Sequence, residues 1–206
     1  MTLIKICGIQ DPETAYFAAS SGAHFIGIIF AKSSPRRVEV EQAIAIAKGA
    51  KKGGAKVIGV FAEQNGEAMQ QMADRIGLDG VQLHGETARK EHPILSPHLI
   101  RLYVFPVSPD GFVKEEHHQG FEALDKGRDF LLYDGVEPGS GKPFHWETFE
   151  PARDYNFFLA GGLSPDNVRT AIDKKQPDGV DVASGVERPR LKKDFDLIKA
   201  FIEEAL

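Results

Sequence analysis

Short apolar runs alternate along the chain with amphipathic segments, in a regular order from the first residues to the last. The runs are rich in β-branched and aromatic residues and lack a clean polar–apolar alternation. That pattern is typical of parallel strands covered by helices. It predicts strands at Leu3–Cys7, Phe25–Phe30, Lys56–Phe61, Gly80–His84, Leu99–Phe105, Asp129–Asp134, Asn156–Ala160 and Gly179–Ala183.

The segments between the runs carry helix signals. Asp11-Pro12-Glu13 supplies an N-cap residue, a first-turn proline and an acid near the positive helix end, which predicts a helix to Gly22. Ser164-Pro165-Asp166 predicts the same kind of start for a helix to Lys174. The other predicted helices are Val40–Ala50, Glu67–Ile76, Thr87–His92, Val113–Gln119, Trp146–Arg153 and Phe195–Leu206.

These elements make eight strand-then-helix units in 206 residues. Two α/β architectures fit, a closed (β/α)8 TIM barrel and an open doubly wound sheet. The number of units and their short, even spacing favour the barrel. Because no linker-like tract divides the chain, we expect a single barrel domain over residues 1–206.

Composition narrows the classes of partner. The formal net charge of −5 argues against a nucleic-acid binder, which would normally carry a basic patch. The chain has no apolar run long enough for a membrane span and no signal peptide is evident, so we expect no membrane partner. A single cysteine cannot form an internal disulfide, and a cytoplasmic protein is the simplest interpretation.

Reactive side chains fall at the predicted strand ends, where a (β/α)8 barrel has its active site. Cys7, His84 and Asp134 end strands, and Arg36 lies in a loop after one. Each residue also has a purely structural interpretation. The cysteine fits a small buried apolar residue, the histidine a structural residue with its hydrogen bonds made, the aspartate a turn former and the arginine a surface charge. Their joint occurrence at strand ends of one fold favours a common site.

Glycines follow the last two strands. Gly161-Gly162 comes after the seventh strand and Ser184-Gly185 after the eighth. Glycine lets the backbone approach a ligand and offer its N–H groups, and such barrels often bind phosphate with these two loops. We therefore predict a phosphate site at these four residues, although Gly161-Gly162 also fits a plain tight turn. The Pro138–Lys142 loop lacks the Walker spacing and is interpreted as a mobile substrate-covering loop.

The ordered set of motifs resembles the phosphoribosylanthranilate isomerase family, the (β/α)8-barrel enzymes of tryptophan biosynthesis. The matching stretches span nearly the whole chain: Lys5–Ile9, Ser34-Pro35-Arg36, Gly59–Phe61, Val81–Gly85, Leu131–Asp134, Gly139–Lys142 with Phe144 and Trp146, Ala160–Leu163 with Asn167-Val168, Gly179–Val182 and Ser184–Glu187. Each is modest alone, but the set is highly specific.

The resemblance implies an Amadori rearrangement of N-(5'-phosphoribosyl)anthranilate, with Cys7 as the base and Asp134 as the acid. It implies that Arg36 binds the anthranilate carboxylate, with His84 near the substrate and Asp181 facing the same region. The expected partner is this phosphorylated small molecule. No metal or organic cofactor is implied, and the protein is expected to be a monomer or a homodimer.

Two features bear on these assignments. A free thiol has a pKa near 8.5, and Lys5, on the same face of its strand as Cys7, is the nearby cation in the sequence. The chain also departs from the family pattern, with His145 where aspartate is common, Ala183 where serine is frequent, and residues 188–191 in place of Pro-Gly. These departures lie in or near the predicted binding loops and not at Cys7 or Asp134, so they affect the expected phosphate binding more than the expected reaction.

Three alternatives stay open. One is another sugar-phosphate isomerase or epimerase barrel, although the histidines lack the metal-site spacing that ribulose-phosphate epimerases need. A second is a broader isomerase that also accepts the aminoaldose of histidine synthesis, whose own enzyme uses paired aspartates. The third is a non-catalytic module that binds a phosphorylated ligand.

Overall fold

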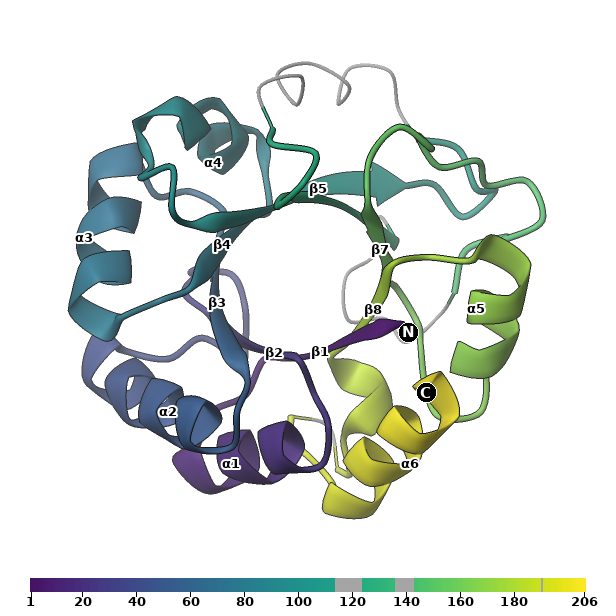
Figure 1. The fold of residues 1–206 in the computed structure, drawn as a ribbon, viewed down its shortest axis with the longest axis horizontal. Coiled ribbons are helices and arrows are strands. Elements are labelled where there is room, and N and C mark those ends of the chain that lie inside the picture. Colours follow the sequence, from purple (N-terminus) through teal and green to yellow (C-terminus); the bar gives the residue numbers. More distant parts are fainter. Residues whose placement is uncertain (114–123, 136–142, 190) are drawn as a thin grey trace.

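The computed structural model describes residues 1–113, 124–135, 143–189 and 191–206. Its strands are β1 Leu3–Cys7, β2 Phe25–Ile29, β3 Lys56–Phe61, β4 Gly80–Leu83, β5 Ile100–Val107, β6 Phe130–Gly135, β7 Phe157–Leu159 and β8 Gly179–Val182. Each strand pairs in parallel with the next, and pairing of β8 with β1 closes the ring (Figure 1). The predicted single-domain (β/α)8 barrel is therefore confirmed.

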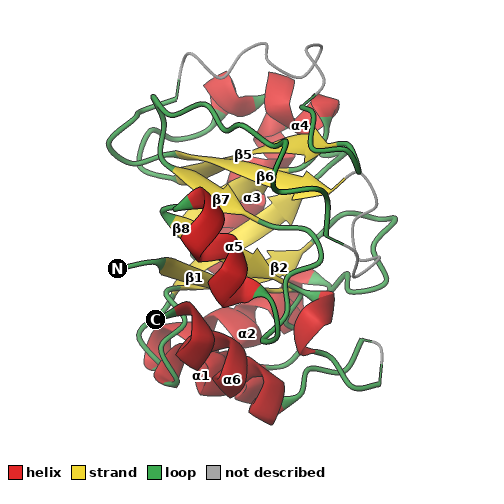
Figure 2. Cartoon of the chain, turned by 90° about the vertical axis from the view of Figure 1, so that its right-hand side faces the viewer, coloured by secondary structure: helices red, strands yellow, loops and turns green. Residues whose placement is uncertain are grey.

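Helices lie outside the ring of strands (Figures 1 and 2). The α-helices are α1 Pro12–Ser20, α2 Val40–Lys52, α3 Gly66–Ile76, α4 Glu86–Lys90, α5 Val168–Lys175 and α6 Phe195–Ala205, and the short 3₁₀ helices η1 His92–Ile94 and η4 Ser184–Val186 accompany them. Asp11 caps α1 through its carboxylate, which accepts a hydrogen bond from the Thr14 N–H at 2.8 Å. The helix start predicted at Asp11-Pro12 is thus confirmed.

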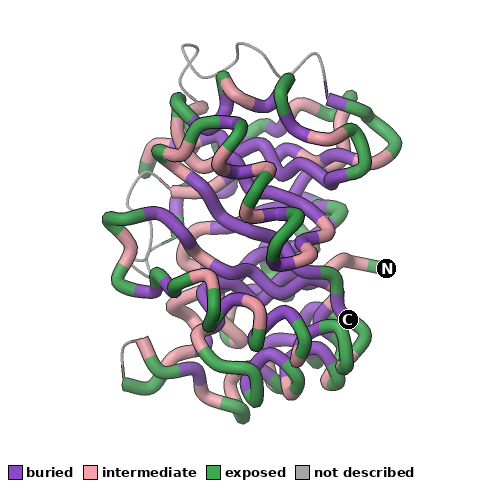
Figure 3. Tube along the Cα trace, turned by 90° about the vertical axis from the view of Figure 1, so that its left-hand side faces the viewer, coloured by how far each residue is buried: buried purple, intermediate pink, exposed green. Residues whose placement is uncertain are grey.

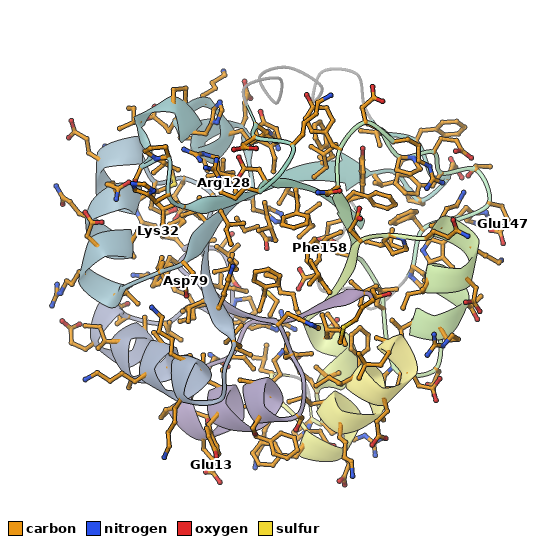
Figure 4. All side chains as sticks on the ribbon, in the orientation of Figure 1. Glu13, Lys32, Asp79, Arg128, Glu147 and Phe158 are labelled. Carbon is orange, nitrogen blue, oxygen red and sulfur yellow. The ribbon has the colours of Figure 1, made fainter. Side chains whose placement is uncertain are left out.

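Two apolar layers hold the barrel together. The larger layer lies between the strands and the helices, and the buried strands run through the middle of the molecule in Figure 3. The smaller one fills the barrel interior with Phe25, Ile58, Ile100, Leu102, Val104, Leu132, Phe158 and Ala160. Phe158 points into the ring, whereas Glu13 and Glu147 lie at its periphery (Figure 4).

Strand register decides which polar side chains also point inward. Residues in register on neighbouring parallel strands share a face of the sheet, and alternate residues along a strand do too. Lys5 is in register with the inward Phe25 and with Asp181, and Cys7 lies two residues further along β1. Asp134 lies two residues beyond the inward Leu132. The register therefore turns all four polar side chains toward the barrel interior.

The helix predicted at Trp146–Arg153 is wrong. Trp146 and Phe149 are buried with a helix-like spacing, but the chain forms a turn followed by an irregular segment. Pro151 lacks an N–H and cannot continue a helix. The next backbone N–H, that of Ala152, donates instead to the Tyr133 hydroxyl at 3.0 Å. Tertiary contacts of apolar side chains produced the helical signal.

The start of α5 also differs from its prediction. The helix begins at Val168, behind a turn over residues 165–167, rather than directly after Ser164. The Asn167 side chain accepts a hydrogen bond from the Ser164 N–H at 2.9 Å and donates one to the Gly162 carbonyl at 2.9 Å. Asn167 therefore ties the start of α5 to the glycine loop after β7.

Three further predictions fall wholly or partly outside the described residues. The helix at Val113–Gln119 overlaps residues 114–123, and the substrate-covering loop at Pro138–Lys142 lies within residues 136–142. Residue 190 belongs to the divergent segment that follows Glu187. All three stay predictions.

Candidate active site

Cys7 lies at the carboxyl end of β1 and its side chain is 5% exposed. Gly27 is its partner in register on β2, and a Cβ atom at that position would lie 2.6 Å from the Cys7 Sγ. The missing side chain of Gly27 therefore gives the sulfur its space. Burial raises the pKa of the Cys7 thiol, and the attraction of the Lys5 ammonium opposes that rise.

A buried ion pair begins at Lys5, two residues before Cys7 on β1. The Lys5 Nζ is 2.9 Å from the Asp181 Oδ1, and the two side chains are 0% and 8% exposed. Burial alone would lower the pKa of Lys5, but the attraction of Asp181 and Cys7 outweighs it and the pKa is raised. Lys5 therefore stays charged inside the barrel.

Asp134, near the carboxyl end of β6, is a carboxyl group that keeps its proton unusually well. Burial and the negative charge of Asp181 raise its pKa to about 7, against an opposing effect of Lys5. A Cβ atom at Gly161, the first loop residue of the glycine pair after β7, would lie 3.1 Å from the Asp134 Oδ1. Gly161 thus leaves space beside the carboxyl group.

One ion pair acts on both reactive groups. Lys5 lowers the pKa of Cys7 and of Asp134, and Asp181 raises both. Cys7 and Asp134 are both inward-facing positions near the carboxyl ends of parallel strands in one closed barrel, so the thiol and the carboxyl group lie at the same end of its interior. The structure therefore brings the predicted base and acid together.

Arg36 is held by a carboxylate that sequence analysis assigned no role. Its Nε and Nη2 atoms donate to the two Glu187 carboxylate oxygens at 2.7 and 2.8 Å. The Lys193 ammonium donates to the same carboxylate at 2.8 Å and the Leu191 N–H at 3.0 Å. Burial opposes the charge of Glu187, but these donors outweigh it and bring its pKa down to about 2.

This pairing leaves one edge of the Arg36 guanidinium for a ligand. Within the described part of the chain no acceptor is paired with Nη1, and Nη2 keeps its second N–H. The stem of Arg36 packs over Gly8, where a Cβ atom would lie 2.6 Å from the arginine Cδ. Gly8 also has a φ of +72°, which favours glycine. The guanidinium is thus fixed near Cys7.

His84 directly follows β4 and is half-buried. Burial lowers its pKa, and the nearby positive charges of Lys5 and Arg89 lower it further. The imidazole is therefore neutral at physiological pH, when it can both donate and accept a hydrogen bond. His84 lies at the carboxyl end of the barrel, and the charges of Lys5 and Asp181 act on it in opposite directions.

The predicted phosphate residues lie in two loops that touch. Gly161 and Gly162 have φ angles of +82° and +70°, a conformation that only glycine adopts without strain. Ser184 and Gly185 begin η4. A Cβ atom at Gly185 would lie 1.9 Å from the Leu163 carbonyl oxygen, so the loops after β7 and β8 are in direct contact.

Two of the positions that depart from the family pattern, Ala183 and Leu191, belong to the hydrogen-bond network around Glu187. The Ala183 carbonyl accepts a hydrogen bond from the Lys193 Nζ at 2.7 Å, so its backbone joins the network around Glu187. Leu191 belongs to that network as well. His145 is exposed, and its backbone N–H donates to the Pro109 carbonyl at 2.9 Å.

No group of three or more His, Cys, Asp or Glu side chains suited to a metal occurs among residues 1–113, 124–135, 143–189 and 191–206. Over the same ranges no helix is long and apolar enough to cross a membrane. Three residues of the site were not predicted from the sequence: Gly27, Glu187 and Lys193. Register with Cys7 would have identified the glycine, but the pairing of Glu187 with Arg36 joins positions 151 residues apart and leaves no local signal.

Fold and site together define a class: a (β/α)8 barrel with a buried thiol, a carboxyl group of raised pKa, an arginine and two glycine loops at the carboxyl ends of its strands, where enzymes of this fold have their active sites. The family model for N-(5'-phosphoribosyl)anthranilate (PRA) isomerase matches residues 4–204. The chain therefore belongs to the PRA isomerase family, and it is an isomerase of tryptophan biosynthesis.

Individual relatives are similar to this chain over nearly its whole length. The N-(5'-phosphoribosyl)anthranilate isomerase of Chlamydia felis is 39% identical over 203 residues, which cover 98% of this chain and 96% of that protein. The enzyme of the same name from Rubrobacter xylanophilus is 36% identical over 210 residues, covering 100% and 99%. The crystal structure of phosphoribosyl anthranilate isomerase from Thermotoga maritima superposes with a TM-score of 0.84 at 36% identity, covering 100% and 98%.

Another similar crystal structure contains a ligand. It is a phosphoribosyl anthranilate isomerase in complex with reduced 1-(o-carboxyphenylamino)-1-deoxyribulose 5-phosphate. Its TM-score is 0.78 at 32% identity, and the match covers 100% of this chain and 98% of that one. That ligand carries a carboxylate at one end and a phosphate at the other.

Proposed function

We propose that this chain isomerises N-(5'-phosphoribosyl)anthranilate to 1-(2-carboxyphenylamino)-1-deoxyribulose 5-phosphate, with Asp134 as the acid and Cys7 as the base. One observation carries the assignment of roles: the thiol and the carboxyl group both face the barrel interior around the Lys5–Asp181 ion pair. Residues 1–206 form the catalytic unit.

Asp134 acts first. Its proton goes to the ring oxygen of the ribose as the C1'–O bond breaks, and the nitrogen lone pair forms the C1'=N⁺ iminium. A pKa of about 7 keeps a useful fraction of this carboxyl group protonated near neutral pH, where an ordinary aspartate is ionised. The negative charges of the bound substrate raise that fraction further.

Cys7 acts second. The thiolate removes the C2' proton, the C–H electrons form the C1'=C2' bond, and the iminium electrons return to nitrogen. The enolamine then gains a proton at C1' and loses one from the 2'-hydroxyl, which gives the ketose. Burial favours the neutral thiol in the free protein. The positive iminium formed in the first step favours the thiolate, so the order acid before base suits the site.

Arg36 anchors the anthranilate carboxylate through the Nη1–Nη2 edge that Glu187 leaves available. His84, neutral at physiological pH, hydrogen-bonds the substrate from β4. Asp181 acts through Lys5, because its carboxylate is already paired with that ammonium. Backbone N–H groups around Gly161, Gly162, Ser184 and Gly185 bind the phosphate. The glycines lack a side chain that would keep the ligand at a distance, and the positive φ angles of Gly161 and Gly162 favour glycine there.

The purified chain tests this function directly. We expect the fluorescence of N-(5'-phosphoribosyl)anthranilate to fall on addition of catalytic amounts of protein, with no response to a chelator. Substrates of the alternatives, ribulose 5-phosphate and the aminoaldose of histidine synthesis, serve as controls and should be turned over far more slowly. Binding without turnover would indicate a phosphate-ligand module, and preference for a control substrate would indicate a different isomerase.

Two properties of the working protein follow from these roles. A base thiol must stay reduced, so we place the protein in the reducing cytoplasm. A structural neighbour is described as monomers of a dimeric phosphoribosylanthranilate isomerase from Thermotoga maritima, which makes both a monomer and a homodimer compatible with the fold. The mass of the protein in solution, measured by light scattering, distinguishes them.

A further inference from the structure

We propose that Lys5 is a positioning residue whose charge stabilises the Cys7 thiolate, and that Asp181 sets the strength of that effect by pairing with Lys5. This inference rests on the proposed role of Cys7 as the base. It concerns how the interior of the barrel makes a buried thiol usable, and it assigns a purpose to the buried Lys5–Asp181 ion pair.

The position of Lys5 is the first support. Its side chain points into the barrel two residues before Cys7 on β1, with 0% of its surface exposed. A buried ammonium is costly unless a partner compensates it. Here Asp181 does so at 2.9 Å from the neighbouring strand β8, in register with Lys5. A buried ion pair contributes little net stability, and this one lies two residues from the reactive sulfur, which supports a functional role for it.

The second support is the sign of the electrostatic effect that Lys5 and Asp181 each have on Cys7. Lys5 favours the Cys7 thiolate by its charge and by side-chain hydrogen bonding, whereas Asp181 disfavours it. Gly27 holds open the space for the sulfur. Lys5 without Asp181 would also lower the pKa of Asp134, so the acid would lose its proton too early. Together the two residues balance the needs of base and acid.

Other charged groups near the sulfur act more weakly or are already engaged. Lys193 also favours the thiolate, but its ammonium is bound to Glu187 and to the Ala183 carbonyl. The Arg36 guanidinium, which the thiolate attracts, is paired with the same glutamate. His84, from β4, is neutral at physiological pH. Lys5 is therefore the principal cation that acts on the thiol.

The single cysteine of the chain permits a measurement without substrate. Protein labelled with ¹³C at the cysteine Cβ has one resonance from Cys7, and its chemical shift reports the titration of the thiol. We expect Lys5→Met to move the titration midpoint upward by about one pKa unit or more, which means tenfold less thiolate at a given pH. Asp181→Asn should move it downward, and Lys5→Arg should stay closer to the wild-type protein than Lys5→Met.

Lys175→Met is the matched control. Lys175 is another buried lysine, 7% exposed, but its ammonium donates to the Phe149 carbonyl at 2.6 Å, outside the barrel. Its replacement should leave the Cys7 midpoint unchanged. Unchanged midpoints in Lys5→Met and Asp181→Asn, or shifts of both in the same direction, would overturn the inference.

The test gives a result even if one of the variants fails to fold. Circular dichroism checks each variant, and if Lys5→Met fails to fold, Asp181→Asn alone decides by a downward shift or its absence. The readout also separates the two claims. Shifted midpoints together with an active Cys7→Ala variant would refute only the role of Cys7 as base, whereas an inactive Cys7→Ala variant with unshifted midpoints would refute only the role of Lys5.

Discussion

Arg36 shows how one side chain can serve two acceptors. Glu187 occupies the Nε–Nη2 edge of its guanidinium, which fixes the plane of the group before any substrate arrives. In the proposed function, the remaining edge then meets the substrate carboxylate at a set position. Preorganisation of this kind improves binding because fewer rotamers are lost when the ligand arrives.

Replacing Arg36 by lysine tests this role. A lysine keeps the charge but offers a single point donor in place of a planar fork, so it cannot serve Glu187 and a ligand carboxylate together. We expect KM to rise by about 10–100-fold with kcat nearly unchanged, since a charge-assisted hydrogen bond contributes about 1.5–3 kcal/mol. Steady-state kinetics on N-(5'-phosphoribosyl)anthranilate measures both constants.

Arg37→Lys is the matched control for that variant. Arg37 is the adjacent arginine, but its side chain is 40% exposed and pairs with the exposed Glu39. We expect it to leave both constants close to their wild-type values. A loss confined to kcat in Arg36→Lys, or an equal effect in Arg37→Lys, would contradict the anchoring role.

At the scale of the elements, glycines on the strands and in the loops after them make room for the reactive side chains of the site. Gly27 on β2 and Gly161 after β7 carry no Cβ where one would crowd the Cys7 sulfur or the Asp134 carboxyl group. Neither contact is visible in a local motif, because each depends on which strand lies alongside. The register of the barrel is thus part of the catalytic geometry.

Gly27→Ala tests the contribution of β2. Gly27 does not have a positive φ, so the added methyl group acts by its volume, 2.6 Å from Sγ, rather than by backbone strain. Displacement of a reacting atom by about 1 Å can cost on the order of 100-fold in rate. We expect kcat to fall at least about tenfold, as measured by the loss of substrate fluorescence, while the protein stays folded.

Gly127→Ala serves as its control. A Cβ atom there meets only Asp125 Oδ1, at 3.4 Å, in an exposed turn far along the chain from Cys7. Its kcat should match that of the wild-type protein. A Gly27→Ala variant with normal kcat would show that the space around the sulfur is not required.

Among the elements, the strands were predicted from the sequence better than the segments between them. All eight strands lie where apolar runs predicted them, since burial on both faces requires such runs. The false helix at Trp146–Arg153 arose because Trp146 and Phe149 are apolar for tertiary reasons, and Pro151 prevents the helix they suggest. Sequence placed Cys7 and Asp134 at strand ends, but Gly27 and Glu187 became apparent only through spatial pairing.

At the scale of the whole molecule, two carboxyl groups of the site make stability depend on pH in opposite directions. Asp134 has a pKa of about 7 in the folded protein, against an ordinary value of 3.8. Its favourable contribution is therefore complete below about pH 4 and is lost as the pH rises through about 7. Glu187 acts in the opposite sense, because its pKa is lowered to about 2 and its contribution is lost only as the pH falls toward that value.

Asp134→Asn should remove the first of these effects. The amide resembles the protonated acid in shape but cannot ionise. We expect the free energy of unfolding of the variant to match that of the wild-type protein near pH 4 and to exceed it by on the order of 2–4 kcal/mol near pH 8. Urea unfolding at the two pH values measures the difference. An equal difference at both pH values would show that the pKa of Asp134 is not raised in the folded protein.

The central claim is that the Cys7 thiol and the Asp134 carboxyl group transfer the two protons of one reaction. The most direct measurement is kcat of Cys7→Ala and Asp134→Asn with N-(5'-phosphoribosyl)anthranilate, alongside the affinity of each variant for reduced 1-(o-carboxyphenylamino)-1-deoxyribulose 5-phosphate. We predict that each variant loses about 10²–10⁴-fold or more in kcat and binds the reduced compound within about tenfold of the wild-type protein. Near-normal kcat in either variant would contradict the claim.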